Sequence, residues 1–290
     1  MRVRDQRKRR ATAGMTRQRT PKQPSGATRT SDWEARAYHA VAEPQFEWGK
    51  RVLATLELAG TERVLDAGCG TGRLTALLAE RLQRGHVVAL DRSYGMAQMA
   101  ISTLAPFVDR ASVVLGDLGD LPFVSAFDAV FSAATFHWVL DHDRLFANLF
   151  DALRAGGRVH AQCGGSGNLE RFLARANALA HQPEYAAEFS GWTRPSNFAS
   201  AEETRARLAR AGFTGIDTWL EEAPVTFSDA SAFRAFVSTV VLRPYLPRID
   251  GEERRTAFVD RLVELAGRDD PAYTLDYWRL NIQARRPTQP

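Results

Sequence analysis

Between residues 63 and 162 the chain alternates short apolar segments with amphipathic ones, and this alternation restricts the possible folds more than any other feature. The apolar segments predict strands at 63–66, 86–91, 111–115, 127–131 and 158–162. Helical spacing predicts helices at 73–83 and from Asp143 to the glycine pair at 156–157, and Ser93 caps another that runs to about residue 104. Strand–helix–strand repeats pair in parallel through right-handed crossovers. We therefore predict an α/β protein with a doubly wound, mostly parallel sheet, whose ligands bind at the carboxyl ends of the strands.

Further elements are predicted on both sides of this repeat. A helix is expected at 44–59 before it, and helices at 168–182, 200–212, 229–242 and 250–266 and strands at 213–220 and 275–285 after it. We divide the chain into a disordered basic tail at 1–30 and one domain at 31–290. Within the domain, residues 31–60 form lid helices, 61–165 the nucleotide-binding core, and 166–287 the cap helices with the last strands.

Net charge distinguishes the tail from the body. Residues 1–30 hold ten Lys or Arg against one acid, Asp5, which gives a charge of +9. Since the whole chain carries +4, residues 31–290 carry −5. The tail is either a tether to nucleic acid or a membrane surface, or a loose leader ahead of a start at Met15; such runs are more often merely solvated. The slightly acidic body argues against a broad phosphate-binding surface.

Cysteine content and hydropathy indicate the compartment. Cys69 and Cys163 are too few for a disulfide framework or a cysteine-based metal site. The longest apolar runs fall far short of the roughly 18 residues that a membrane helix needs, and no apolar stretch follows the Arg-rich start. We expect a cytoplasmic monomer or homodimer with no metal and no membrane partner.

A glycine-rich loop between a strand and a helix is the first candidate binding element. It runs from Asp66 through Gly68, Cys69 and Gly70 to residue 72. Glycines let a ligand approach the backbone and the helix N–H groups. A dinucleotide fingerprint would have its third glycine where this chain has Arg73. The carboxylate of Asp66 would repel a pyrophosphate and attract a cationic or amino-bearing ligand.

Two more acids close the next two strands. Asp91 is placed to accept hydrogen bonds from both hydroxyls of a ribose, and Asp117 from an adenine amino group. One such acid alone is readily explained as a helix or turn cap, but that explanation fits the whole set poorly. Together with the loop, the acids describe a nucleoside with a positively charged, phosphate-free tail, which is S-adenosylmethionine.

At these residues the sequence resembles the class I S-adenosylmethionine-dependent methyltransferases, from Trp33 to about residue 287. Residues 64–72 match the family's nucleotide loop, Asp91 its ribose acid, 116–118 its adenine contact and 153–157 the turn before its fifth strand. The resemblance implies a seven-stranded Rossmann-like sheet with an antiparallel last strand and a helical cap.

Within the family the chain is most similar to the trans-aconitate methyltransferase group, in stretches at 33–38, 136–142, 241–246 and 277–286. Ala133 departs from that group, which commonly has Asn there, so any contact to the methionine moiety must come from the backbone. The predicted cofactor-binding residues are Trp33, Tyr38, Asp66, Gly68, Cys69, Gly70, Asp91, Arg92, Met96, Asp117, Leu118 and Ala133.

Aromatic residues are candidates for a lid over the sulfonium, because a cation is attracted to aromatic ring faces. Trp33 and Tyr38 are the better candidates, since their spacing matches the subgroup, and Trp138 is another. For Phe46 and Trp48 we favour packing within their helix.

The chemistry requires little of the protein, because a sulfonium methyl is already activated and has only to meet an aligned nucleophile. A carboxylate acceptor is ionised at pH 7, whereas a phenol or hydroxyl needs a base, and His137 is the candidate catalytic residue. His137 could instead line the acceptor pocket or hydrogen-bond the backbone. The predicted substrate residues are Trp138, Arg194, Arg243 and Tyr245, of which the last three would clamp an acidic acceptor.

We therefore predict a small-molecule methyltransferase that forms a methyl ester on a carboxylate. The first alternative is C- or O-methylation of a lipid, quinone-like or phenolic acceptor, which the aromatic cap favours. A second is methylation of nucleic acid, with the basic tail as anchor. Against it, residues 132–136 lack the Asn/Asp-Pro-Pro-aromatic cluster that grips a base amine, and the body is acidic.

Overall fold

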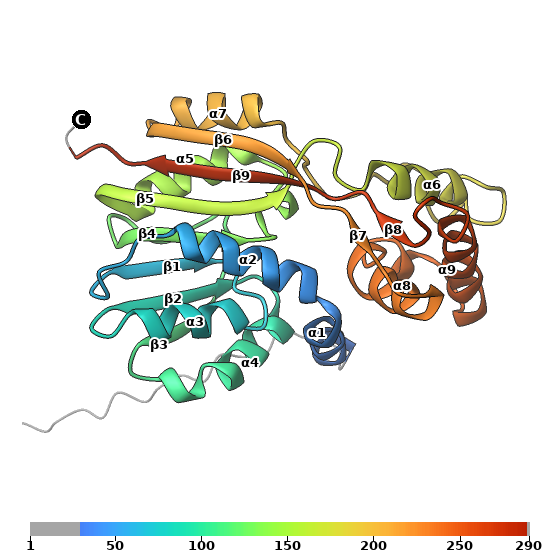
Figure 1. Cartoon of the computed structure of the whole chain (residues 1–290), viewed down its shortest axis with the longest axis horizontal. Coiled ribbons are helices and arrows are strands. Elements are labelled where there is room, and N and C mark those ends of the chain that lie inside the picture. Colours follow the sequence, from blue (N-terminus) through green and yellow to red (C-terminus); the bar gives the residue numbers. More distant parts are fainter. Residues whose placement is uncertain (1–29, 289–290) are drawn as a thin grey trace, which may run out of the picture.

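The computed structural model describes residues 30–288, with side chains from residue 35 onward. Its larger lobe is a seven-stranded sheet of order β3-β2-β1-β4-β5-β9-β6 with helices on both faces (Figure 1). The strands are β1 (Arg63–Ala67), β2 (His86–Asp91), β3 (Ala111–Leu115), β4 (Phe127–Ala133), β5 (Leu153–Gly164), β6 (Thr214–Glu222) and β9 (Trp278–Arg285). β9 runs antiparallel to both of its neighbours. The predicted fold class is confirmed, while the predicted tail lies outside the described residues except for Thr30.

Each face of the sheet has its own apolar core, because successive side chains of a strand point to opposite faces. In β1, Val64 packs with α2 (Glu43–Thr55), α3 (Arg73–Arg81) and α4 (Tyr94–Thr103). The next residue, Leu65, packs on the other face with α5 (His142–Ala152) and α7 (Ala201–Arg210).

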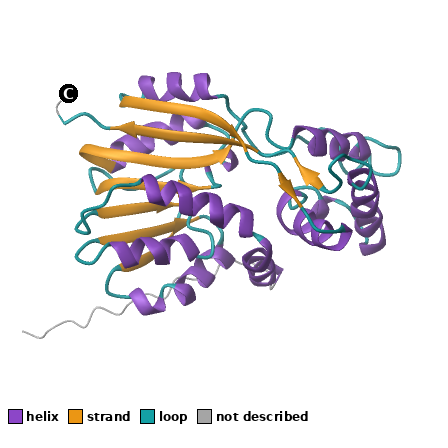
Figure 2. Cartoon of the chain, viewed as in Figure 1, coloured by secondary structure: helices purple, strands orange, loops and turns teal. Residues whose placement is uncertain are grey.

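A smaller, mainly helical lobe lies beyond the carboxyl ends of the parallel strands (Figures 1 and 2). It contains α6 (Glu170–Ala180), α8 (Ala230–Phe236), the π-helix η3 (Val237–Val241), α9 (Glu252–Ala266) and a short ribbon of β7 (Val225–Thr226) and β8 (Thr274–Leu275). Its core is rich in aromatic rings, among them Phe233, Phe236, Tyr245 and Phe258. The helix α1 (Thr30–Val41) contacts both α4 of the large lobe and η3 of the small one.

Three elements depart from the prediction in more than the position of their ends. The glycine pair at 156–157 does not stop α5, which ends at Ala152, but lies inside the longer β5. The helix expected at 229–242 divides into α8 and η3, where the hydrogen bonding changes to the wider π pattern. The strand expected at 275–285 divides into β8 and β9, which belong to two different sheets.

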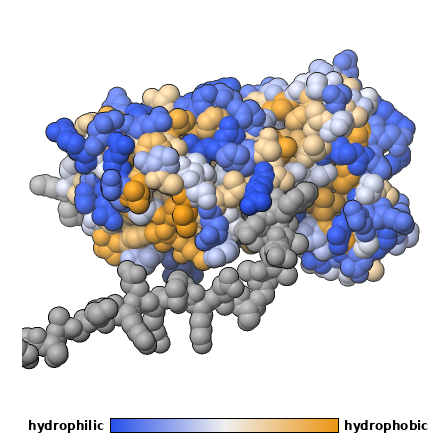
Figure 3. All heavy atoms as spheres, turned by 90° about the horizontal axis from the view of Figure 1, so that it is seen from below, coloured by the Kyte–Doolittle hydropathy of each residue, from blue (hydrophilic) through white to orange (hydrophobic). Residues whose placement is uncertain are grey.

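The two edge strands of the large sheet are β3 and β6. Figure 3, which views the molecule from the β3 side, shows apolar surface on the larger lobe. Ile101 of α4, and Val108 and Val124 in the segments before and after β3, are exposed. Among residues 30–288, no helix combines the length and the apolar character that a membrane span requires.

Candidate active site

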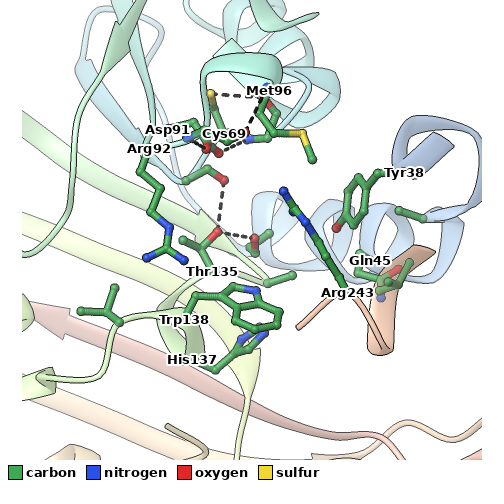
Figure 4. Close-up of a pocket in the computed structure, with 18 of the residues that line it drawn as sticks. Tyr38, Gln45, Cys69, Asp91, Arg92, Met96, Thr135, His137, Trp138 and Arg243 are labelled. Atoms are coloured by element: carbon green, nitrogen blue, oxygen red, sulfur yellow. Dashed lines mark hydrogen bonds between the residues drawn. The ribbon is translucent and has the colours of Figure 1, made fainter. Parts of the chain in front are cut away.

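A cavity of about 590 Å³ lies where the carboxyl ends of β1, β2 and β4 face α1 and the small lobe (Figure 4). A cavity of this size is typical of small-molecule sites. The predicted residues that line it are Tyr38, Asp66, Gly68, Cys69, Gly70, Asp91, Arg92, Met96, Asp117, Leu118, Ala133, His137, Trp138, Arg194 and Arg243. The structure therefore brings together nearly all of the predicted site.

The glycine loop is held on one side and open on the other. The backbone N–H groups of Gly68 and Cys69 donate to the carbonyl of Leu90 at 2.8 and 2.9 Å, which ties the loop to β2. Gly68 has φ +87°, and a Cβ there would lie 2.2 to 2.6 Å from the side chain of Thr135. A Cβ on Gly70 (φ +55°) would meet nothing within 4 Å. The backbone at Gly70 therefore borders open space in which a ligand can lie.

Asp91 presents its carboxylate to the cavity with spare acceptor capacity. Its Oδ2 accepts from the N–H of Gly70 at 2.9 Å, and its Oδ1 accepts from the N–H of Ser93 at 2.8 Å. Burial raises the pKa of this carboxyl, while the two backbone hydrogen bonds oppose the rise. Each oxygen keeps a further lone pair, so the group can accept hydrogen bonds from ligand hydroxyls.

Asp66, near the end of β1, is a buried acid that no described basic side chain neutralises. It is 2% exposed, and its Oδ2 accepts a hydrogen bond of 2.6 Å from the hydroxyl of Thr75. Burial raises its pKa to about 7, and the charge of Asp91 acts in the same direction. No Lys or Arg among residues 35–288 forms an ion pair with Asp66. The site is therefore suited to a ligand that brings a positive charge.

Asp117 and its neighbour form the rim of the cavity. Asp117 is exposed, and its Oδ1 accepts from the N–H of Gly119 at 2.7 Å. The turn-cap explanation thus holds for this acid, which also lines the cavity. Leu118 is buried beside it.

His137 lies on the opposite side of the cavity from Asp91 (Figure 4). Its Nδ1 lies 3.2 Å from the backbone N of Gly164, which can only donate, so Nδ1 is the acceptor. In the neutral ring the proton is then on Nε2. Burial and the charges of Arg279 and Arg194 lower the pKa of His137 well below its usual range. A ring in this state can donate a hydrogen bond from Nε2 but has no free lone pair with which to act as a base, and the predicted hydrogen bond to the backbone is present.

Arg194 lies beside two aromatic rings at the same end of the cavity. Its guanidinium carbon is 5.1 Å from the ring centroid of Trp138 and 5.2 Å from that of Phe198. Its Nη1 donates to Ser196, while its buried Nε has no hydrogen-bond partner in the described part of the chain. Arg194 therefore lies in the cavity wall with one buried donor unsatisfied.

Sequence reasoning missed Arg279, which lines the cavity from β9. It is 2% exposed, and its guanidinium carbon lies 4.5 Å from the ring centroid of Trp48. Its Nε is 3.4 Å from Oε1 of Gln162, and its Nη2 is buried with no hydrogen-bond partner within residues 35–288. No local signal singled it out, because Arg279 is one of four polar residues, with Asn281, Gln283 and Arg285, that alternate along β9.

One predicted substrate residue lies elsewhere. Tyr245 is fully buried in the small lobe, where its hydroxyl donates to Oδ1 of Asn177 at 2.6 Å and its ring packs edge-on against Trp192. The prediction that it clamps the acceptor is wrong, because the turn after η3 directs Arg243 to the cavity and Tyr245 into the core.

The aromatic residues of the N-terminal helices divide between cavity and core. The rings of Trp48 and Tyr277 pack edge-on with their centroids 4.9 Å apart. Trp48 therefore has a packing role, as we expected. Phe46 lines the cavity, with the guanidinium carbon of Arg73 3.8 Å from its ring centroid. Tyr38 points into the cavity next to Arg243 (Figure 4). The side chain of Trp33 lies outside the described part of α1.

The residues present fit S-adenosylmethionine. The open backbone at Gly70 and the spare lone pairs of Asp91 suit a ribose, and the buried, unpaired carboxyl of Asp66 suits the cofactor's amino group. A seven-stranded sheet with an antiparallel β9 and this glycine loop at its carboxyl edge is the arrangement of a methyltransferase that uses this cofactor.

Known proteins agree with that class. Residues 64–157 match the family described as a methyltransferase domain. The chain is 32% identical over 206 residues to malonyl-[acyl-carrier protein] O-methyltransferase of Geobacter sulfurreducens, covering 70% of this chain and 75% of the relative. It is 29% identical over 261 residues to trans-aconitate 2-methyltransferase of Deinococcus radiodurans, covering 88% and 92%. Phosphoethanolamine N-methyltransferase 2 of Haemonchus contortus, solved with S-adenosyl-L-methionine, has a similar fold, with a TM-score of 0.58 at 18% identity over 90% of this chain and 58% of that one.

The chain therefore belongs to the class I S-adenosylmethionine-dependent methyltransferases. It is an enzyme of small-molecule methylation with S-adenosylmethionine as its cofactor, and its predicted likeness to the trans-aconitate methyltransferases is confirmed.

Proposed function

We propose that this enzyme O-methylates a carboxylate of a small acidic molecule. The observation that carries the proposal is a group of hydrogen-bond donors at one end of the cavity with no described acid lining the wall beside them. The acids that line it, Asp66, Asp91 and Asp117, come from the ends of β1, β2 and from the loop after β3. At the other end the lining contains Arg194, Arg279 and the hydrogen-bond donor His137, and none of the described lining residues there is acidic.

The cofactor residues take distinct roles in this proposal. Asp91 would accept hydrogen bonds from the ribose hydroxyls. The protein backbone at 68–70 would contact the cofactor, and Asp66 would pair with its amino group. Tyr38, which points into the cavity (Figure 4), would attract the sulfonium, because an aromatic face attracts a cation. Asp117 and Leu118 border the adenine, and Arg92, Met96 and Ala133 form the remaining walls.

The acceptor residues hold an anion and keep water away. Bound S-adenosylmethionine would supply an activated methyl group, and a carboxylate oxygen would take it as the carbon–sulfur electron pair returned to sulfur. No proton moves, so no base is needed. Arg194 and Arg243 face the acceptor as donors that match a carboxylate. The Nε2–H of His137 donates to it, and Trp138 and Phe198 provide the apolar walls.

Two relatives support this substrate class by name. One is a malonyl-[acyl-carrier protein] O-methyltransferase and the other a trans-aconitate 2-methyltransferase, and both names refer to carboxylic acids. A phenol would need a base, and the Nδ1 of His137 is occupied by the N–H of Gly164.

The test is transfer of labelled methyl from S-adenosylmethionine to a panel of mono-, di- and tricarboxylates, fatty acids and phenols, followed by mild alkali. We expect label in the acids, released by alkali as methanol, because methyl esters hydrolyse under these conditions. Alkali-stable label would overturn the proposal and indicate carbon, nitrogen or ether methylation.

A further inference from the structure

We propose that Arg279 is the buried binding site for a carboxylate of the acceptor, and that Gln162, Asn281 and Glu221 position it. This inference rests on the proposed function, because it assigns an anionic group to the acceptor end of the cavity. It names a residue that none of the sequence motifs for cofactor binding includes.

The first step is that the buried guanidinium of Arg279 lacks a hydrogen-bond acceptor for Nη2 among the described residues. A guanidinium is ionised at any pH at which the protein is folded, and a buried charge without a partner is strongly unfavourable. The ring of Trp48 lies over one face of the guanidinium and attracts its charge. The N–H groups, however, point in the guanidinium plane, and Nη2 has no acceptor among the described residues. Nη2 is itself covered by protein, but the side chain lines the cavity, so an acceptor group of a ligand can approach the guanidinium from there.

The second step is the chemistry of the missing partner. A guanidinium presents its donors as a planar fork, which matches the two oxygens of a carboxylate. The nearest described acid on the adjoining strand, Glu221, is the cross-strand partner of Arg279 in β6, yet no ion pair joins the two. The charge of Glu221 thus favours the ionised guanidinium, and no ion pair with a described acid satisfies it.

The third step is a chain of directed hydrogen bonds that leads from Arg279 to the surface. Gln162 accepts from Nε of Arg279 at 3.4 Å through Oε1, and its Nε2 donates to Oδ1 of Asn281 at 2.7 Å. The Nδ2 of Asn281 lies 3.4 Å from Oε2 of Glu221, whose other oxygen is 3.8 Å from Arg51. Each amide in this chain has one orientation that satisfies both neighbours. The Nδ2 of Asn281 also lies 3.4 Å from the backbone carbonyl of Arg279, so Glu221 and that carbonyl together set the orientation of both amides and, through them, of the guanidinium.

Sheet register explains why these side chains meet. Gln162 of β5 and Asn281 of β9 are directly paired residues, and Glu221 of β6 pairs with Arg279. Gln162, Asn281 and Glu221, with Arg51, also line a second, smaller hollow of about 150 Å³. Glu221 can therefore be changed at the surface without a change to the cavity wall.

The decisive variant is Gln162→Glu, which would place a carboxylate beside Arg279 inside the protein. We expect the new acid to pair with the guanidinium, so that the fold is kept while a ligand carboxylate is excluded. The probe is malonate, titrated into the protein saturated with S-adenosylhomocysteine and followed by calorimetry. Wild type should bind malonate, and Gln162→Glu should weaken that binding at least tenfold with unchanged affinity for S-adenosylhomocysteine.

Three further variants complete the experiment. Arg279→Gln should also lose malonate binding at least tenfold, whereas Arg285→Gln, an exposed arginine of the same strand, should bind like wild type and controls for general anion effects. Glu221→Gln should weaken malonate binding severalfold and raise KM for the acid acceptor with little change in kcat, and Glu221→Asp should restore part of the loss. A purely structural role for these residues would not produce that split.

The outcomes separate the two proposals. Equal malonate binding in wild type, Gln162→Glu and Arg279→Gln, or no binding by wild type, would overturn the Arg279 site. Binding that depends on Arg279 together with alkali-stable methyl transfer would keep the site and overturn ester formation as the reaction.

Discussion

At the scale of single residues, Asp66 combines a cost in stability with a function in binding. Its pKa is raised from the ordinary value to about 7, so above pH 7 the folded protein holds a buried charge that the unfolded chain would hold in water. Near pH 4 the folded protein holds the group protonated, and most of the penalty disappears. The stability lost to this group therefore grows as pH rises from about 4 to about 7.

Asp66→Asn should accordingly stabilise the ligand-free protein at pH 8, by up to about 4 kcal/mol, since one pKa unit corresponds to about 1.4 kcal/mol. The amide oxygen can still accept from Thr75, so the local packing is retained. The difference should shrink towards pH 4.5, and affinity for S-adenosylmethionine should fall because the amino group loses its counter-charge. Urea unfolding at both pH values and calorimetry measure this; equal stability of the two proteins at pH 8 would contradict it.

His137 gives a second prediction at this scale. His137→Ala should lower kcat/KM for the acid acceptor about 10- to 100-fold, because a hydrogen bond to a charged group contributes about 1.5–3 kcal/mol. Burial lowers the pKa of His137 well below its usual range, so wild type and variant should share one pH dependence of the rate over pH 6–9, including any inflection from Asp66. A wild-type inflection in this range that disappears in the variant would restore His137 as a base.

At the scale of elements, the loop from β1 to α3 contains one glycine needed for packing, Gly68, and one needed for ligand binding, Gly70. Gly68→Ala forces a Cβ against Thr135, whose hydroxyl is 3.1 Å from the carbonyl of Gly68, and should cost about 2–4 kcal/mol of unfolding free energy. Gly70→Ala meets no neighbour and should cost only about 1–2 kcal/mol for its left-handed backbone. Its methyl group enters the cavity, however, so binding of S-adenosylhomocysteine should weaken at least tenfold. Denaturant unfolding and calorimetry separate the two effects, and equal losses of stability would refute the distinction.

The same scale shows what the sequence could predict and what it could not. The glycine loop and Asp91 were found because each follows its strand directly, so local pattern places it. Arg279 depends on the register of β9 against β5, a pairing of residues more than 100 positions apart that no local pattern specifies. Tyr245 was misplaced for the related reason that a turn after η3 decides which of two nearby residues faces the cavity.

At the scale of the whole molecule, the cavity joins two lobes with separate cores. The acids and the glycine loop belong to the large lobe, and Val240, Val241 and Arg243 line the cavity from the small lobe. α1 contacts both α4 and η3 and so connects the lobes over the cofactor end. Its His39 Nδ1 lies 3.0 Å from the hydroxyl of Thr71 in the glycine loop, which couples α1 to that loop directly.

This arrangement predicts two stages of protection against amide hydrogen exchange. S-Adenosylhomocysteine alone should slow exchange in the glycine loop and in α1, because a ligand that binds only the closed arrangement stabilises it by mass action. An acid acceptor added to that complex should extend the protection to η3 and the turn at 242–245, since only then are both ends of the cavity filled. The acid alone should protect neither α1 nor the loop. Protection confined to the large lobe in every complex would show that the small lobe does not take part in acceptor binding.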